Sequence, residues 1–346
     1  MTVNTTTLRL PLNTLAIAFG LAGLAEVWTF ASTALSLPPL IGDTLWMLAA
    51  VGWAWLMVAH LRRGHTSSES LLQQLRNPIQ GPIAALAPVV GMLLAAELFT
   101  VWPVVSRILV IIFVSLSAIL AGWLIAEWCG GGIPLDAIHG GYFLPTVAGG
   151  FIAANAAAAT GLTSLAVGAF LVGTFFWIVM FAIIVARLMF RPPLPNPLVP
   201  TLAIFLAPPA VAGIAWFRIT GETGTIEYGL AAITAVMALI QLGLIPRYLS
   251  LPFSIGFWSF TFPVAAAGSL GILWLTRLHP DGWEALVAAI AAGVTALIVG
   301  IAAQSITSVR RDSRRQVAPA TVVVADHEPG SPIATPSAYN KKIEVS

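Results

Sequence analysis

The sequence predicts an all-α integral membrane protein with ten transmembrane helices, and three observations support this prediction. Hydrophobic residues make up 58% of the chain, charged residues only 9%, and the mean hydropathy is +0.92. A soluble domain contains about 25% charged residues. Apolar runs of about 20 residues recur along the chain, which is the length that a spanning helix needs. Strands of a membrane barrel would alternate polar and apolar residues over about ten positions, and that alternation is weak here.

The predicted spans follow one another along most of the chain. They lie near residues 12–36, 39–61, 80–102, 103–128, 142–161, 162–188, 200–219, 225–249, 252–276 and 282–306. The first is longer than the apolar part of a signal peptide and a second span follows at once, so we expect it to be retained. The chain then divides into an N-terminal segment, 1–11, a transmembrane domain, 12–306, and a Pro- and Ser-rich tail, 307–346, which is expected to be disordered.

Basic residues are unevenly distributed between the two sides of this topology. Of the 16 lysine and arginine residues, only Arg107, Arg218 and Arg277 fall on the side opposite the chain termini. By the positive-inside rule, both termini are predicted to be cytoplasmic. The expected location is a bacterial inner membrane.

Helix-breaking residues favour the odd-numbered spans. The internal ones are Gly20 and Gly23 in the first span, Pro82 and Pro88 in the third, Pro145 in the fifth, Pro208 and Pro209 in the seventh, and Pro263 in the ninth. In the even spans, proline occurs only near the ends. Irregular backbone at membrane depth is tolerated where it is buried in protein or lines a watery cavity. The pattern predicts five helical hairpins whose odd helices form an inner, pore-lining ring. The alternative is that proline is simply commoner in membrane helices.

The stretch "FWSFTFPVAAAG", residues 257–268, places an aromatic ring beside the proline of the ninth span. On a helical wheel, Phe262 shares its face with Ser259, Ala266 and Ser269, while the neighbouring phenylalanines point away. A bulky apolar side chain on a small-residue, pore-facing surface would form a hydrophobic constriction, which can gate a channel by dewetting. The alternative is that Phe262 only fills space between helices.

Two stretches resemble a known family of transport proteins. "LMFRPPLPNPLVPTLAIFLAPPAVAGIAW" (188–216) and "FSIGFWSFTFPVAAAG" (253–268) are similar to parts of the tellurite-resistance/dicarboxylate transporter family, which includes TehA-like proteins and plant slow-type anion channels. "FGLAGLAEVW" (19–28) and "NPIQGPIAALAPVVGMLL" (77–94) resemble it more weakly. The resemblance covers about residues 12–306. It implies five hairpins around a pore, assembly as a homotrimer, and a role for Phe262 as the residue that occludes the pore.

Glu26, Glu97 and Asn155 are polar side chains inside predicted spans that we consider as functional candidates. A carboxylate in the bilayer core costs a few kcal/mol and is a functional candidate. Glu26 could couple transport to protons, or it could be protonated or paired between helices. Glu97 is expected to reach the outer surface or to pair with Arg107. Asn155 could donate a hydrogen bond to an anion or to a neighbouring helix.

Several classes of function lack support in the sequence. The single cysteine, Cys129, excludes an internal disulfide, and no metal-ligand array, phosphate-binding loop or nucleophile–base set is present. We therefore expect no metal, cofactor, enzymatic activity or nucleic-acid partner. The leading interpretation is a channel or channel-like exporter for small inorganic or organic anions. The alternative is a proton-coupled secondary transporter of dicarboxylate, sulfite or tellurite. A membrane scaffold would leave the helix breakers in the inner ring without a purpose.

Overall fold

The computed structural model describes residues 9–317, and every regular element in that range is helical. Ten helical stretches are long and apolar enough to cross a membrane, as the sequence predicts. They are Leu12–Ala34, Leu40–Thr66, Gly81–Thr100, Pro103–Cys129, Gly140–Ala159, Thr163–Phe190, Asn196–Thr220, Thr225–Leu249, Ile255–Leu278 and Trp283–Arg311. Their bounds agree with the predicted ones to within a few residues, and the largest differences are the longer C-terminal ends of the second and tenth spans.

The even and odd spans are built differently. Each even span is one α-helix: α2 (Leu40–Thr66), α5 (Pro103–Cys129), α7 (Thr163–Phe190), α9 (Thr225–Leu249) and α11 (Trp283–Val317). Each odd span has an α-helix in its C-terminal part: α1 (Leu15–Ala34), α4 (Leu86–Glu97), α6 (Gly149–Ala159), α8 (Ala207–Thr220) and α10 (Thr261–Leu278).

A segment of 3-10 or π helix precedes each of these five α-helices. The segments are η1 (Leu12–Thr14), η2 (Gly81–Ala85), η5 (Gly140–Phe143) with the π-helical η6 (Leu144–Ala148), η7 (Asn196–Leu206) and η8 (Ile255–Phe260). The remaining short elements are α3 (Leu71–Arg76), η3 (Leu98–Thr100) and η4 (Leu135–Ala137). Irregular backbone is thus concentrated in the N-terminal halves of the odd spans.

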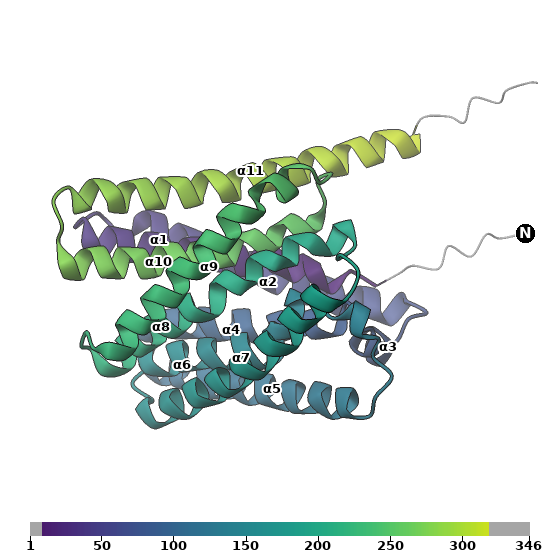
Figure 1. The fold of residues 1–346 in the computed structure, drawn as a ribbon, viewed down its shortest axis with the longest axis horizontal. Coiled ribbons are helices and arrows are strands. Elements are labelled where there is room, and N and C mark those ends of the chain that lie inside the picture. Colours follow the sequence, from purple (N-terminus) through teal and green to yellow (C-terminus); the bar gives the residue numbers. More distant parts are fainter. Residues whose placement is uncertain (1–8, 318–346) are drawn as a thin grey trace, which may run out of the picture. The chain divides into compact units, whose positions relative to one another are not determined.

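The odd spans form an inner ring and the even spans surround it. Between 50% and 83% of the residues in the apolar windows of the odd spans are buried, against 17% to 28% in the even ones. The ring closes because α1 contacts α4 and α10, α6 contacts α4 and α8, and α8 contacts α10. Figure 1 shows α1 and α10 side by side, although they lie far apart in the sequence. The predicted inner ring of odd helices is confirmed.

The prolines of the inner ring lie mostly at the starts of α-helices. Pro88 is the third residue of α4, Pro208 and Pro209 are the second and third of α8, and Pro263 is the third of α10. An amide in the first turn of an α-helix has no partner within that helix, so proline there costs little. The expectation that Pro263 itself breaks a mid-span α-helix is therefore wrong. The break is the change from η8 to α10 at Thr261.

The two glycines of the first span also act differently from the prediction. The helix α1 runs through Gly20 and Gly23 without interruption, so neither residue breaks it. A Cβ at Gly20 would overlap the Thr261 side chain, and one at Gly23 would lie 3.0 Å from the Phe262 ring. Both glycines let α10 approach α1 closely.

The predicted tail begins with a helix. Residues 307–317 continue α11 to Val317, so the expected disorder is wrong for this part. The other residues of the predicted tail, 318–346, and residues 1–8 of the N-terminal segment lie outside the described range.

Candidate functional site

A cavity of about 60 Å3 lies inside the inner ring. All of the residues that line it belong to odd spans, and half of them come from the 3-10 and π-helical segments of these spans. Its walls are largely apolar, with polar groups from Asn13, Thr201 and Ser259. A water molecule needs about 10–15 Å3 of such volume, so the cavity has room for a few waters or a small ion.

Two stacked phenylalanine rings border the cavity on the side toward the C-terminal ends of the odd spans. Phe19 of α1 and Phe262 of α10 lie with their ring centroids 3.6 Å apart and their planes 13° from parallel. Both side chains are buried and both line the cavity. The helices α1 and α10 continue past these rings toward their C-terminal ends.

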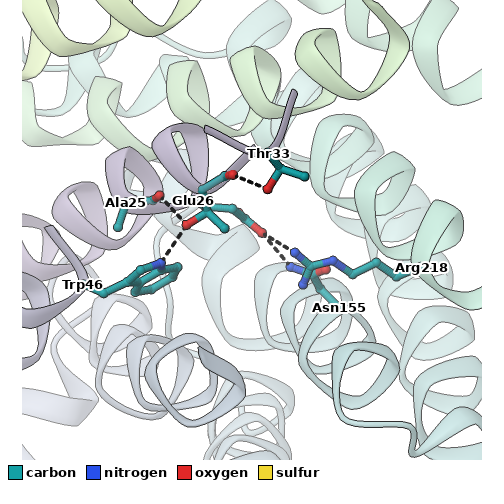
Figure 2. Close-up of polar contacts among 7 residues, drawn as sticks. Ala25, Glu26, Thr33, Trp46, Asn155 and Arg218 are labelled. Atoms are coloured by element: carbon teal, nitrogen blue, oxygen red, sulfur yellow. Dashed lines mark hydrogen bonds and ion pairs between the residues drawn. The ribbon is translucent and has the colours of Figure 1, made fainter. Parts of the chain in front are cut away.

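A polar bridge joins α1 to α6 and α8 farther along the inner ring. Glu26 lies seven residues after Phe19 on α1, which is about 10 Å farther along the helix axis. Its carboxylate Oε1 accepts a hydrogen bond from Asn155 Nδ2 of α6 at 3.2 Å and lies 3.5 Å from Arg218 Nη2 of α8. Figure 2 shows these three side chains meeting. The neighbours of α1 in the ring are α4 and α10, so the bridge reaches helices on the opposite side.

The bridge gives Glu26 a paired environment. The Glu26 side chain is 7% exposed and that of Arg218 is 29% exposed, and the guanidinium of Arg218 also lies over the Phe30 ring. Pairing between helices was one of the alternatives that the sequence left open for Glu26.

Glu97, by contrast, forms no ion pair among the described residues. Arg107, its expected partner, donates instead to the carbonyl oxygen of Thr160.

The other predicted site residues fall into two groups. Pro208, Ser259, Phe262 and Pro263 lie in the cavity wall. Residues that are buried but outside this wall are Gly20, Gly23, Pro88, Pro145, Pro209, Ala266 and Ser269. Ser269 follows Phe262 by two helical turns, and its hydroxyl has no hydrogen-bond partner among the residues that the structure describes. Pro145 instead lines a groove outside the ring, between α5 and α7.

A buried arginine lies at the other end of the molecule, where α7 ends. Arg187 is 1% exposed, and its guanidinium donates to the carbonyl oxygens of Pro192, at 2.8 Å, and Asp136, at 3.1 Å. No carboxylate among the described residues lies within ion-pair distance of it, and its Nε has no partner. From the sequence, Arg187 counts only among the basic residues on the side of the chain termini. A buried positive charge balanced only by carbonyl dipoles makes the surrounding region electropositive.

His139 lies next to this arginine and is held neutral. It is completely buried, with Nδ1 accepting from the Gly141 amide at 3.1 Å and Nε2 lying 3.2 Å from the carbonyl oxygen of Ile79. Burial lowers the pKa of His139 to about 4, the Ile79 hydrogen bond opposes this, and the charge of Arg187 lowers the pKa further. The hydrogen bonds fix the neutral tautomer with the proton on Nε2. His139 thereby anchors the start of η5, whose Gly141 and Phe143 line the cavity.

A family model described as voltage-dependent anion channel matches residues 9–306. The chain belongs to this family. The match covers nine spans completely and most of the tenth, so the resemblance seen in the four sequence motifs is confirmed.

Individual members of the voltage-dependent anion channel family are distant relatives. The tellurite resistance protein TehA homolog of Haemophilus influenzae is 25% identical over 259 residues, which cover 74% of this chain and 79% of the relative. The S-type anion channel SLAH3 of Arabidopsis thaliana is also 25% identical, over 78% of this chain and 44% of the relative. The guard cell S-type anion channel SLAC1 of the same plant is 24% identical over 75% and 49%. The chain thus spans about half the length of these two plant channels.

Proposed function

We propose that the protein is an anion channel whose lumen is closed by the Phe262 ring stacked on Phe19. The main support for this proposal is the cavity inside the five odd spans, which these two rings border. An apolar constriction without a tight binding site suits conduction, since an ion must leave as readily as it enters. The permeant species are small inorganic or organic anions, in keeping with the names of the relatives.

The charge distribution supports anions over cations. Arg187 supplies a buried positive charge at one end of the inner ring, and the Glu26 carboxylate is paired with Arg218 at the other. A fixed, unpaired carboxylate in the lumen would repel an anion, and the pairing reduces that repulsion.

The gate is tested by the conductance of variants in planar bilayers. Phe262→Ala should raise anion conductance, because removing the ring widens and wets the constriction. Phe257→Ala and Phe260→Ala serve as controls, since both side chains line a groove outside the ring between α9 and α11. Conductance equal to or lower than that of the wild type, in a Phe262→Ala protein that folds normally, would refute the gate.

Thermal stability in detergent separates gating from packing. One side of Phe262 borders the cavity, so its truncation should cost less than the ~3–5 kcal/mol typical of a phenylalanine in a close-packed core. A loss in that range together with unchanged conductance would mark Phe262 as a packing residue.

A second candidate is a proton-coupled secondary transporter of dicarboxylate, sulfite or tellurite. The bridge from Glu26 to Asn155 and Arg218 favours it, because protonation of Glu26 would release two helices on the far side of the ring. Anion flux into liposomes distinguishes the two. Saturable flux that a protonophore abolishes, and that loses this sensitivity in Glu26→Gln, supports coupled transport. Flux that follows the anion gradient and ignores the protonophore supports the channel.

The assembly and location belong to the same proposal. The protein is a homotrimer in a bacterial inner membrane, each protomer has its own pore, and both termini face the cytoplasm. The excess of basic residues on the side of the termini supports this orientation. Crosslinking in native membranes should reach a trimer, and products that stop at the dimer would contradict this assembly.

A further inference from the structure

A groove with two arginines at one end lies on the outside of the inner ring, between α7 and α9. We name it the α7–α9 groove. It has a volume of about 360 Å3, and η7 forms its floor with Leu202 and Phe205. Its side walls are largely apolar and include Leu188 of α7 and Leu244 of α9. Arg191 and Arg247 complete the lining.

The two arginines lie at the same end of the groove. Arg191 directly follows the last residue of α7, and Arg247 is the third residue from the end of α9. Both are even spans, so they end at the same face of the membrane, the one from which the odd spans start. On the proposed orientation this is the cytoplasmic face.

The charges of both side chains are available to a ligand. Arg247 is exposed and forms no ion pair among the described residues. Arg191 lies 3.9 Å from a carboxylate oxygen of Asp136, at the outer limit of an ion pair, and about half of each side chain is exposed. An exposed pair of this kind contributes little, so Asp136 does not compete strongly with a phosphate.

Two other grooves separate outer helices, and they differ from this one in charge. The groove between α9 and α11 has a volume of about 630 Å3 and the one between α5 and α7 about 520 Å3. Neither has an arginine, lysine or histidine among the described residues that line it. Largely apolar walls are thus common to all three grooves, and of the three only the α7–α9 groove adds positive charge at the membrane surface.

We propose that the α7–α9 groove binds one anionic phospholipid. Its phosphate lies between Arg191 and Arg247, and one acyl chain follows the apolar walls past Leu188 and Leu244. From Phe181 to Arg191 the α7 wall is ten residues, or about 15 Å, long, which accommodates much of an acyl chain. Basic pockets between spanning helices are suited to anionic headgroups, and each arginine near the surface contributes about fivefold in affinity.

The headgroup contact is tested by native mass spectrometry of the delipidated full-length protein. The ligands are dioleoyl phosphatidylglycerol, dioleoyl phosphatidylcholine and inorganic phosphate. Arg191→Gln/Arg247→Gln should weaken binding of the first phosphatidylglycerol by about 30-fold and leave phosphatidylcholine binding unchanged. Arg62→Gln/Arg63→Gln is the matched control. It removes two charges near the C-terminal end of α2, which lies at the same membrane face as the ends of α7 and α9, but outside the groove. This variant should bind phosphatidylglycerol as the wild type does.

The acyl contact is tested with a second pair of variants on α9. Leu244→Trp fills the α7–α9 groove and should reduce phosphatidylglycerol binding, whereas Leu242→Trp enters the uncharged groove beside α11 and should not. Equal affinity of the wild type for the two lipids, or unchanged phosphatidylglycerol binding in the double arginine variant, would overturn the proposal. Thermal stabilisation by inorganic phosphate alone that matches the stabilisation by phosphatidylglycerol would also overturn it, because it would make the acyl chain irrelevant.

Discussion

The Phe19 and Phe262 rings share one stacked contact, so the loss of either ring removes the same contact. Residues that act through a shared contact give effects that do not add. The proposed closure of the lumen therefore depends on a pair of side chains from two neighbouring helices, and each ring limits the movement of the other.

Phe19→Ala should raise anion conductance as Phe262→Ala does, because it leaves the Phe262 ring free to leave the lumen. The double variant should exceed the more conductive single variant by little. Planar-bilayer recordings of the two single variants and the double one measure this. A double variant whose conductance equals the product of the two separate gains would show that the rings act independently.

His139 makes stability depend on pH. Its pKa is lowered to about 4 by burial, against about 6.5 in the unfolded chain. Its contribution is complete above the unfolded pKa and is lost as the pH falls from about 6.5 to about 4, because the unfolded chain binds the proton first. His139→Asn should therefore reduce the loss of stability between pH 7 and pH 4.5 by about 2 kcal/mol. Thermal unfolding in detergent at the two pH values tests this, and an unchanged pH dependence would contradict it.

Site residues could be predicted from the sequence only where one helix carried the signal. The face of Phe262, with Ser259 and Ala266, follows from the period of the helix. Its partner Phe19 lies more than 240 residues away, and no period connects the two positions. From the sequence, Arg218 counts only among the basic residues on the side opposite the chain termini, yet its guanidinium pairs with Glu26.

At the scale of helices, close contact between α1 and α10 positions the proposed gate. Gly20 lies against Thr261, whose hydroxyl donates to the carbonyl oxygen of Trp258 at 2.7 Å, where η8 becomes α10. Gly23 lies against the Phe262 ring itself. The two glycines therefore make room for the first residues of α10, and they do not bend α1.

Gly20→Ala should destabilise the protein by about 1–3 kcal/mol, because the added methyl group overlaps Thr261 and overpacks the contact. Gly243→Ala is the matched control in α9, where an added Cβ meets nothing within 4 Å. It should be neutral or stabilising by up to about 1 kcal/mol. Thermal stability in detergent measures both, and equal effects would mean that α1 and α10 have room to separate.

The alternation of odd and even helices could be predicted because proline and glycine are tolerated where neighbouring protein covers the backbone. The 3-10 segments could not be predicted from the same residues. In η7 and η8, the apolar sequence has no periodicity that separates a 3-10 from an α-helix, and packing within the ring selects between them. A proline such as Pro263 indicates that a helix begins nearby, and its position alone does not say where.

For the whole molecule, the ten spans determine which ends of the helices share a membrane face. Cys129 is the only cysteine and is exposed at the end of α5, so the wild-type chain already carries one topology reporter. Asp281 lies between α10 and α11, at the opposite ends of the spans.

A membrane-impermeant thiol reagent should label Cys129 only from the cytoplasmic side. In a Cys129→Ser background, Asp281→Cys should react only from the other side. Labelling is compared in right-side-out and inverted vesicles. Reaction of both positions from the same side would contradict the ten-span topology.

The 3-10 segment η7 affects the length of the chain across the membrane. Its eleven residues rise about 22 Å as a 3-10 helix and would rise about 17 Å as an α-helix. Rewinding η7 would draw α8 along the axis by about 5 Å, close to one α-helical pitch, while the uninterrupted helices α7 and α9 keep their length. Arg218 is part of α8, so the distance from its guanidinium to Glu26 depends on the helix type of a segment that touches neither residue.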